Sequence, residues 1–269
     1  MTIGLILASL SLATGAGTIA SYYPKMQSNQ ATLLPRRQQA LMVLALLLAI
    51  SAFFLQPGIV GYVLGALAIV PAALFLLGTS TSGLPSLQPA VSVGALAPDF
   101  SAIDAEGMPF HLSNLRGEPV LIKFFRGYWC PYCIAELKQL DDSAKEFAAL
   151  GIKLVALSSD RVDELRPFKQ KQNWDITLLA DPELVVHRQY RVEFRKFSPK
   201  RGPFRDLAIP TTILIDRDGR VLLLEQTSDF RVRPQASMIL AKAKALLATN
   251  ERQFDHAASC DVCAAIDPT

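Results

Sequence analysis

The first 93 residues contain no aspartate and no glutamate, which restricts the folds open to this part of the chain. Its charged residues are Lys25, Arg36 and Arg37, and they account for the whole-chain net charge of +3. The remaining 24 of the 27 basic residues balance the 24 acidic residues. A neutral, charge-rich remainder is typical of a water-soluble domain, and it gives no electrostatic reason to expect nucleic acid as a partner.

The uncharged part contains three apolar segments that approach the length of a membrane span, which needs about 20 mostly apolar helical residues. These segments are residues 3–23, 40–55 and 59–77. Gln56-Pro57-Gly58 separates the last two, so we expect them to form a helical hairpin. We therefore predict a transmembrane anchor over residues 1–78, in contact with membrane lipid. Residues 79–93, rich in Ser, Gly and Pro, are the expected linker.

The orientation of this anchor follows from its three positive charges. Lys25, Arg36 and Arg37 lie between the first and second segments, and positively charged loops favour the cytoplasmic side. If all three segments span, the rest of the chain faces the cytoplasm from a multi-pass position, in the inner or plasma membrane of a bacterium. An alternative is that the first segment is a cleaved signal peptide, but no positive charge precedes its apolar run.

Residues 94–250 alternate between strand and helix patterns. The expected strands are residues 120–125, 152–157, 211–215 and 221–225, and the expected helices are residues 134–150, 162–172, 181–190 and 234–248. Asp160 is expected to open the second helix, and Asp181 to cap the third with Pro182 at its first position. Residues 216–219 give a hairpin turn signal. This order predicts an α/β sandwich, with helices on both faces of a mixed central sheet.

The motif Cys130-Pro131-Tyr132-Cys133 follows a buried strand and begins a helix. Unpaired N–H groups give a helix N-terminus a partial positive charge, which stabilises the reactive thiolate form of cysteine. One helical turn brings the second sulfur near the first, so the pair can form a disulfide. We expect Cys130 to be exposed and to attack a substrate, and Cys133 to be more buried and to resolve the mixed disulfide. Alternatives are half of a metal site or two unreactive packing thiols.

Pro210 immediately precedes an expected strand in Ile209-Pro210-Thr211. It is either an ordinary proline at the start of a strand or a cis-proline that packs against the C-x-x-C motif and presents backbone groups to an extended substrate. The residues alone leave both possibilities open.

Several motifs follow one another along the chain: residues 97–100 (APDF), 112–117 (LSNLRG), 124–133 (FFRGYWCPYC), 157–160 (LSSD) and 209–216 (IPTTILID). In this order they resemble the redoxin branch of the thioredoxin-like superfamily. This branch includes the alkyl hydroperoxide reductase/thiol-specific antioxidant (AhpC/TSA) family and membrane-tethered thioredoxin-like proteins. The resemblance covers residues 96–248 and implies a thioredoxin-like fold, with a redoxin domain over residues 94–250. It also implies that the bond before Pro210 is cis.

The resemblance implies two possible chemistries. A peroxiredoxin site resembles P-x-x-x-T-x-x-C; here its cysteine falls on Cys133, its threonine on Cys130 and its proline on Arg126. Pro210 also occupies a slot where peroxiredoxins carry an arginine, and Trp129 is similar to the tryptophan of thioredoxins. We therefore favour dithiol–disulfide exchange with a disulfide-bearing protein. A thiol peroxidase is the alternative, with Arg126 as a cation that stabilises the thiolate. A non-catalytic redox sensor or assembly factor is a third possibility.

Glu136 lies one helical turn beyond Cys133. In membrane-tethered thioredoxin-like proteins a glutamate at this spacing assists proton transfer from the buried cysteine, so the resemblance implies that role here; the alternative is a solvated glutamate on the helix surface. Thioredoxins carry a buried aspartate where this chain has Phe124, which shifts the proton route to Glu136, Lys123 or water.

The other features carry weaker signals. Cys260 and Cys263, in the tail 251–269, form a second C-x-x-C without an adjacent strand, and they can serve as a redox relay, as metal ligands or in neither role. The basic stretch 188–205 is either a patch for anionic partners or a solvated insertion. No glycine-rich nucleotide loop follows a strand, so no organic cofactor is implied. The expected reductant is a thioredoxin or glutathione system.

Overall fold

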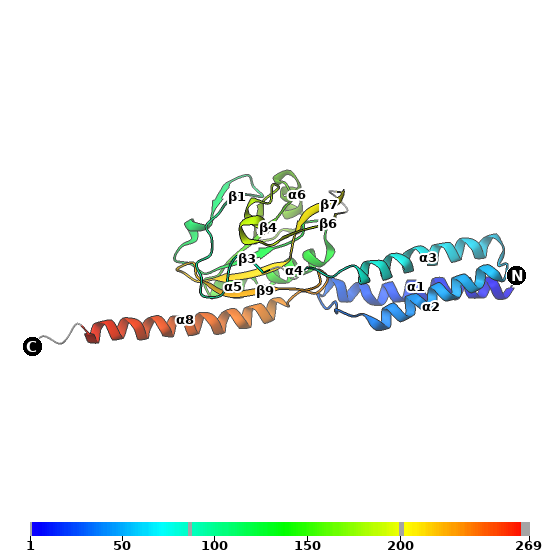
Figure 1. Cartoon of the computed structure of the whole chain (residues 1–269), viewed down its shortest axis with the longest axis horizontal. Helices are drawn as coiled ribbons and strands as arrows, with labels where there is room; N and C mark the ends of the chain where they lie inside the picture. Colours follow the sequence, from blue (N-terminus) through cyan, green and yellow to red (C-terminus); the bar gives the residue numbers. More distant parts are fainter. Residues whose placement is uncertain (1, 86–87, 199–201, 265–269) are drawn as a thin grey trace, which may run out of the picture. The chain divides into compact units, whose positions relative to one another are not determined.

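The computed structural model describes residues 2–85, 88–198 and 202–264, while the side chains of 195–198, 202–205 and 251–264 lie outside this description. The chain divides into two compact units (Figure 1). The helical unit comprises Met1–Leu84 and Ser228–Arg233, and the second unit comprises Pro85–Thr227 and Pro234–Thr269.

The helical unit contains α1 (Thr2–Gln27), α2 (Arg36–Phe54) and α3 (Gly58–Ser80), and each helix contacts the other two. Small residues fill the interfaces, including Ala45 and Ala49 on α2 and Gly65 and Ala72 on α3. The large apolar side chains instead point outward. This arrangement is the inverse of a water-soluble bundle and suits a lipid environment, where small residues let helices approach closely. All three helices are long and apolar enough to cross a membrane, although crossing itself remains a prediction.

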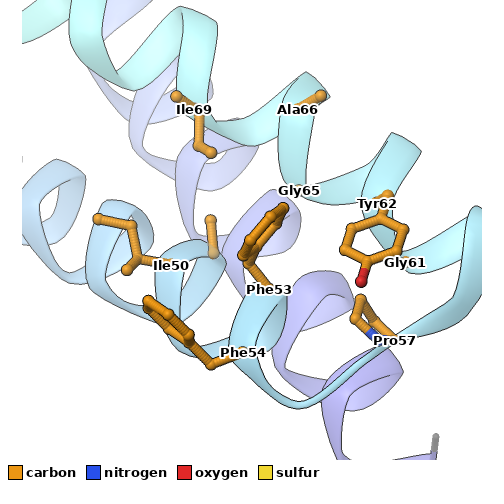
Figure 2. A pocket seen from close by; sticks show the side chains of 10 residues that line it. Ile50, Phe53, Phe54, Pro57, Gly61, Tyr62, Gly65, Ala66 and Ile69 are labelled. Carbon is orange, nitrogen blue, oxygen red and sulfur yellow. The ribbon is translucent and has the colours of Figure 1, made fainter.

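An apolar pocket of about 440 Å³ lies between α2 and α3 (Figure 2). Phe53, Phe54 and Tyr62 contribute aromatic rings to its wall, and the ring centroids of Phe53 and Tyr62 are 5.3 Å apart. Gly65 leaves the α3 side open, since no atom lies within 4 Å of the position of an added Cβ, whereas Pro57 packs closely against Gly61.

A segment distant in sequence completes the helical unit. In Ser228–Arg233, the Asp229 carboxylate accepts a 2.6 Å hydrogen bond from the Ser82 hydroxyl and a 2.7 Å bond from Arg231 Nη2. The same guanidinium nitrogen donates to the Leu33 carbonyl, in the α1–α2 connection, at 3.0 Å. Burial alone would raise the pKa of Asp229, but the hydrogen bonds from Arg231 and Ser82 outweigh it and lower that pKa.

The second unit is built on a seven-stranded mixed sheet in the order β2-β1-β5-β4-β3-β8-β9. Its strands are β1 (Ser101–Asp104), β2 (Pro109–His111), β3 (Val120–Phe124), β4 (Lys153–Ser158), β5 (Thr177–Ala180), β8 (Thr211–Ile215) and β9 (Val221–Gln226). The pairs β3–β4 and β4–β5 are parallel, and the other pairs are antiparallel. The mixed sheet expected from the sequence is therefore confirmed.

Helices and a separate hairpin surround this sheet (Figure 1). The helices are α4 (Pro131–Asp142), α5 (Ala144–Ala149), α6 (Val162–Gln172), α7 (Val185–Tyr190) and α8 (Ala236–Ala264), with a short 3-10 turn at Leu112–Leu115. The hairpin consists of β6 (Glu193–Ser198) and β7 (Gly202–Ala208), within the basic stretch noted above. The sequence analysis did not predict this hairpin or the short strands β1, β2 and β5.

Two helix N-caps differ from the sequence expectation, although α6 has the expected bounds. Arg161 occupies the N-cap of α6, while the Asp160 carboxylate turns back to accept bonds from Ser158 and the loop before α4. Helix α7 begins at Val185 rather than at Pro182, because Asp181 first forms a turn with Leu184. The Asp181 carboxylate then accepts the Val185 N–H at 2.8 Å, so it caps the helix from four residues upstream.

Candidate active site

The loop between β3 and α4 is shaped by Gly127. Its φ of +146° is a conformation that L-residues rarely adopt, and a Cβ atom there would lie 2.4 Å from Trp129 Nε1. The buried Asp160 carboxylate, at the end of β4, accepts the Tyr128 N–H at 2.8 Å and the Ser158 hydroxyl at 2.8 Å. The turn at Gly127 and the hydrogen bond to the buried Asp160 carboxylate therefore fix the conformation of the loop that precedes α4.

The two cysteines occupy the first turn of α4. Cys130 is the N-cap residue with Pro131 after it, and the Cys133 and Ile134 N–H groups each donate to the Cys130 carbonyl at 3.0 Å. Both sulfur-bearing side chains are reduced. This geometry matches the expectation of a C-x-x-C pair at a helix N-terminus, where the partial positive charge of the helix favours a thiolate.

The expected exposure of Cys130 is wrong. The exposed fraction is 1% for Cys130 and 0% for Cys133, and both belong to the hydrophobic core cluster between the sheet and α4. Tyr128, Trp129 and Tyr132 pack against the same cluster as half-buried side chains. Sequence spacing placed the motif at a helix start but could not indicate that the first cysteine belongs to this core.

Arg126 and Trp129 form a stacked pair beside the motif. Arg126 is buried, and its guanidinium carbon lies 5.2 Å from the centroid of the Trp129 ring. A guanidinium over an indole face is a favourable cation–π arrangement. The pair places a permanent positive charge in the loop that leads into Cys130.

Glu136 is buried at 3% exposure, which excludes the alternative of a solvated glutamate. Its Oε1 atom lies 2.6 Å from the ammonium nitrogen of Lys123, on β3, and Lys123 also donates to the Thr212 hydroxyl at 3.0 Å. Lys123 is 2% exposed, so a complete ion pair lies inside the core. The sequence pointed to both residues separately but did not predict that they contact each other.

The implied cis bond before Pro210 is wrong, because none of the described peptide bonds is cis. Pro210 is buried and directly precedes β8, whose first residue, Thr211, pairs with Phe124 at the end of β3. It therefore lies beside the loop that leads to the cysteines. Trans is the lower-energy form of an X-Pro bond by about 0.5–1 kcal/mol, and a proline at the start of a strand needs no special isomer.

The buried pair of Asp181 and His187 was not predicted from the sequence. His187 Nδ1 lies 2.6 Å from Asp181 Oδ2, and the imidazole packs edge-on to Phe124. Burial would raise the pKa of Asp181, but its hydrogen bonds with His187 and the attraction of that ring lower the pKa below its usual value. Phe124 lies in the core cluster on the sheet face away from the cysteines, so this pair stabilises α7 rather than the motif.

The second C-x-x-C falls on α8. The side chains of Cys260 and Cys263 lie outside the described residues, and their role stays a prediction.

Comparison with known proteins identifies the second unit. The model of the AhpC/TSA family matches residues 93–223. The chain contains an AhpC/TSA-family domain. Peroxiredoxin Bcp of Escherichia coli K12 is 29% identical over 131 residues, covering 49% of this chain and 83% of Bcp. Chloroplastic peroxiredoxin Q of Sedum lineare is 28% identical over 134 residues, covering 50% of this chain and 68% of that protein.

Solved structures agree on the fold of this AhpC/TSA domain. A mutant of peroxiredoxin 6 from Arenicola marina aligns with a TM-score of 0.55 at 18% identity, covering 60% of this chain and 76% of that one. AhpC of Enterococcus faecalis aligns with a TM-score of 0.52 at 16% identity, covering 60% and 95%. The predicted thioredoxin-like fold and its redoxin branch are thereby confirmed, and the domain is a thiol-dependent oxidoreductase.

Proposed function

We propose that the protein is a membrane-anchored thiol peroxidase that reduces small hydroperoxides through a disulfide cycle between Cys130 and Cys133. The burial of both cysteines is the observation that carries this choice of substrate. Hydrogen peroxide is close to water in size, whereas the disulfide of a folded protein reaches residues that are 1% exposed or less only after the first turn of α4 opens. The peroxiredoxin names of the relatives support the same chemistry.

The proposed cycle uses both cysteines in turn. The Cys133 thiolate, at the position of the peroxiredoxin cysteine, attacks the hydroperoxide; its O–O bond breaks, an alcohol leaves after taking a proton, and Cys133 becomes a sulfenic acid. The Cys130 thiol then attacks that sulfur, water leaves, and the Cys130–Cys133 disulfide forms. One hydroperoxide is reduced as two thiols are oxidised, and an external dithiol restores them.

Cations near the motif support thiolate formation in place of the missing threonine and arginine. Arg126 and Lys123 are both buried, and α4 adds the positive end of its dipole. The external dithiol attacks Cys130, the first cysteine of the motif, and because both cysteines are buried this step requires the first turn of α4 to open. A thioredoxin-type protein is the reductant that fits such a disulfide.

Dithiol–disulfide exchange with a protein substrate is the second candidate, favoured by the Cys-Pro-Tyr-Cys motif and Trp129. The trans bond before Pro210 removes one expected feature of that substrate-binding mode.

The anchor and its orientation are part of the proposal. The outward-facing apolar side chains of α1–α3 support insertion in a lipid bilayer. Lys25, in the last turn of α1, and Arg36 and Arg37, in the first turn of α2, support a cytoplasmic location for the AhpC/TSA domain.

The deciding experiment compares the full-length chain in detergent with its Cys130→Ser and Cys133→Ser variants. Each reduced protein is mixed rapidly with hydrogen peroxide, an alkyl hydroperoxide or a protein disulfide, and the loss of thiol is followed. The proposal expects fast reaction with a hydroperoxide that is lost in Cys133→Ser and stops at a sulfenic acid in Cys130→Ser. Fast reaction only with the protein disulfide, lost in Cys130→Ser, would establish the second candidate instead.

A further inference from the structure

A hollow of about 450 Å³ in the AhpC/TSA domain lies at the start of α6, and the proposed cycle does not use it. Its apolar lining comprises Ile103 on β1, Val162 at the start of α6, and Ala180 and Pro182 at the end of β5. Ile103 is 43% exposed, so the hollow presents apolar surface to solvent. A concave site of this size, with apolar walls and a few charged groups, is typical of a binding site.

The topology of the sheet places this hollow beside the cysteines. Strands β3, β4 and β5 are parallel neighbours, so the segments that follow them lie at the same edge of the sheet. Helices α4 and α6 cover the same face, because Leu137 of α4 and Leu165 of α6 belong to the core cluster that contains both cysteines. The start of α6 is therefore next to the start of α4, since packed helices lie about 8–10 Å apart.

Two contacts join the hollow to the cysteine motif. The Asp160 carboxylate accepts the Tyr128 N–H at 2.8 Å, and the next residue after Asp160, Arg161, lines the hollow. Val162, which also lines it, packs against the core cluster that contains both cysteines. A molecule seated in the hollow would therefore adjoin the turn of α4 that must open to expose a disulfide of Cys130.

Arg166 gives the hollow a fixed positive charge. Its exposed guanidinium donates to two backbone carbonyls of the β1–β2 connection, at 3.2 and 2.9 Å. Backbone carbonyls carry no net charge, so these bonds hold the guanidinium in place without neutralising it. Arg161 and Asp163, which also line the hollow, form an exposed ion pair at 3.0 Å, and Glu106 is paired with Lys169 at 2.9 Å. Arg166 is therefore available to a carboxylate of a partner.

We propose that this hollow is the docking site of the protein dithiol that reduces the Cys130–Cys133 disulfide. The partner places apolar side chains in the hollow and a carboxylate against Arg166. Protein interfaces combine an apolar centre with arginine, and arginine is enriched among the residues that contribute most to binding. Because the disulfide is buried, a docking surface beside α4 holds the reductant in place while the first turn of that helix opens.

The inference deepens the proposed function and rests on it, because it takes Cys130–Cys133 as the disulfide that must be reduced. A thiolate of the docked partner attacks Cys130, and Cys133 leaves as a thiolate that takes a proton from solvent. The second thiolate of the partner then attacks its own sulfur in the mixed disulfide, and Cys130 leaves. Both thiols of the motif are restored, and the partner departs with the disulfide.

The test measures reduction of a preformed disulfide in the full-length chain in detergent. Cys260 and Cys263 are replaced by serine, and diamide oxidises Cys130 and Cys133. The rate of reduction is then measured with reduced thioredoxin, a protein dithiol, and with dithiothreitol, a small one. We expect Arg166→Glu to slow the reaction with thioredoxin about tenfold, as for loss of an important interface residue, and to leave the reaction with dithiothreitol unchanged.

Lys171→Glu is the matched control, because it makes the same charge change at an exposed residue of the same helix, outside the hollow. Its rates with both reductants should stay close to those of the parent chain. Arg166→Lys keeps the charge and should keep most of the rate with thioredoxin. Ile103→Gln removes part of the apolar wall and should slow thioredoxin but not dithiothreitol.

Equal thioredoxin rates for Arg166→Glu and Lys171→Glu would overturn the inference. Equal slowing of thioredoxin and dithiothreitol would also overturn it, since the substitution would then act on the disulfide rather than on docking. A disulfide that dithiothreitol reduces and thioredoxin does not would exclude this class of partner. If Arg166→Glu does not fold, Ile103→Gln decides by the same comparison. Diamide forms the disulfide without a hydroperoxide, so a failure of the proposed peroxidase activity is detected separately.

Discussion

Replacing Gly127 by alanine tests whether the loop geometry before α4 controls the active site. The backbone conformation there should cost about 1–3 kcal/mol for a residue with a Cβ atom. The new atom also meets Trp129 Nε1 at 2.4 Å and Asp160 Oδ1 at 3.0 Å, so the indole must leave its rotamer, at about 0.5–1.5 kcal/mol. We therefore expect Gly127→Ala to destabilise the domain by about 3 kcal/mol.

Gly151 provides the matched control. Its φ of +72° is also in the left-handed region, but no atom lies within 4 Å of the position of an added Cβ. Gly151→Ala should therefore cost about 1 kcal/mol, from the backbone alone. The difference of about 2 kcal/mol corresponds to a melting temperature about 4–8 °C lower for Gly127→Ala in a domain of this size.

The assay is thermal unfolding of both full-length variants in detergent, with initial rates of hydroperoxide consumption measured at a temperature where both are folded. Gly127→Ala should also react more slowly, because Trp129 and the Cys130 N-cap move with the loop. Equal melting temperatures for the two variants would refute the argument that the Trp129 contact matters. A normal rate in a destabilised Gly127→Ala would show that the loop supports the fold but not the reaction.

Two further predictions concern buried carboxylates. The pKa of Asp181 is lower in the folded state than in the unfolded chain, so its pair with His187 stabilises the domain above about pH 4, and this contribution is lost as the pH falls through the folded value. In Asp181→Asn the unfolding free energy, measured by denaturant titrations, should therefore depend less on pH below about pH 4, and an unchanged dependence would contradict this. Arg231→Met leaves the Asp229 charge in the core of the helical unit without its main cation, so we expect a loss of about 3 kcal/mol, near the low end for a broken buried pair. Detergent-induced unfolding monitored by circular dichroism would measure it, and Arg231→Lys should recover part of the loss.

Local patterns predicted the reactive motif, while the environment of that motif depended on distant contacts. Cys130-Pro131-Tyr132-Cys133 was placed at a helix start because strand, proline and helix signals are adjacent in the sequence. Cys130 is buried because it belongs to a core assembled from several elements, which residue spacing within the motif does not indicate. The ion pair between Lys123 and Glu136 joins a strand to a helix, across 13 residues of sequence. The sequence therefore identified each residue as a candidate but did not predict that the two are in contact.

The fold shows the same division between local and distant determinants. Strands β3 and β8 are fully buried, β4 and β9 are partly buried, and all four were predicted within one or two residues. Strands β1, β2 and β5 have three or four residues each, and their stability comes from pairing with partners elsewhere in the chain. The cis bond before Pro210 was expected from the resemblance to the family. The bond is trans, and a proline at the start of a strand can adopt this isomer without special support.

Ser228–Arg233 makes the helical unit an assembly of two stretches of chain that lie on either side of the linker. A protease cut within residues 88–93 would release a peptide that carries α1–α3, but its Ser82 and Leu33 would still hold Asp229 and Arg231 of the other fragment. The protein should thus behave as a split protein, whose two pieces can be expressed separately and recombined through six residues. Conversely, removing α1–α3 would leave Ser228–Arg233, just before α8, without the residues that it contacts. The AhpC/TSA domain therefore cannot be separated from the helical unit without exposing this segment.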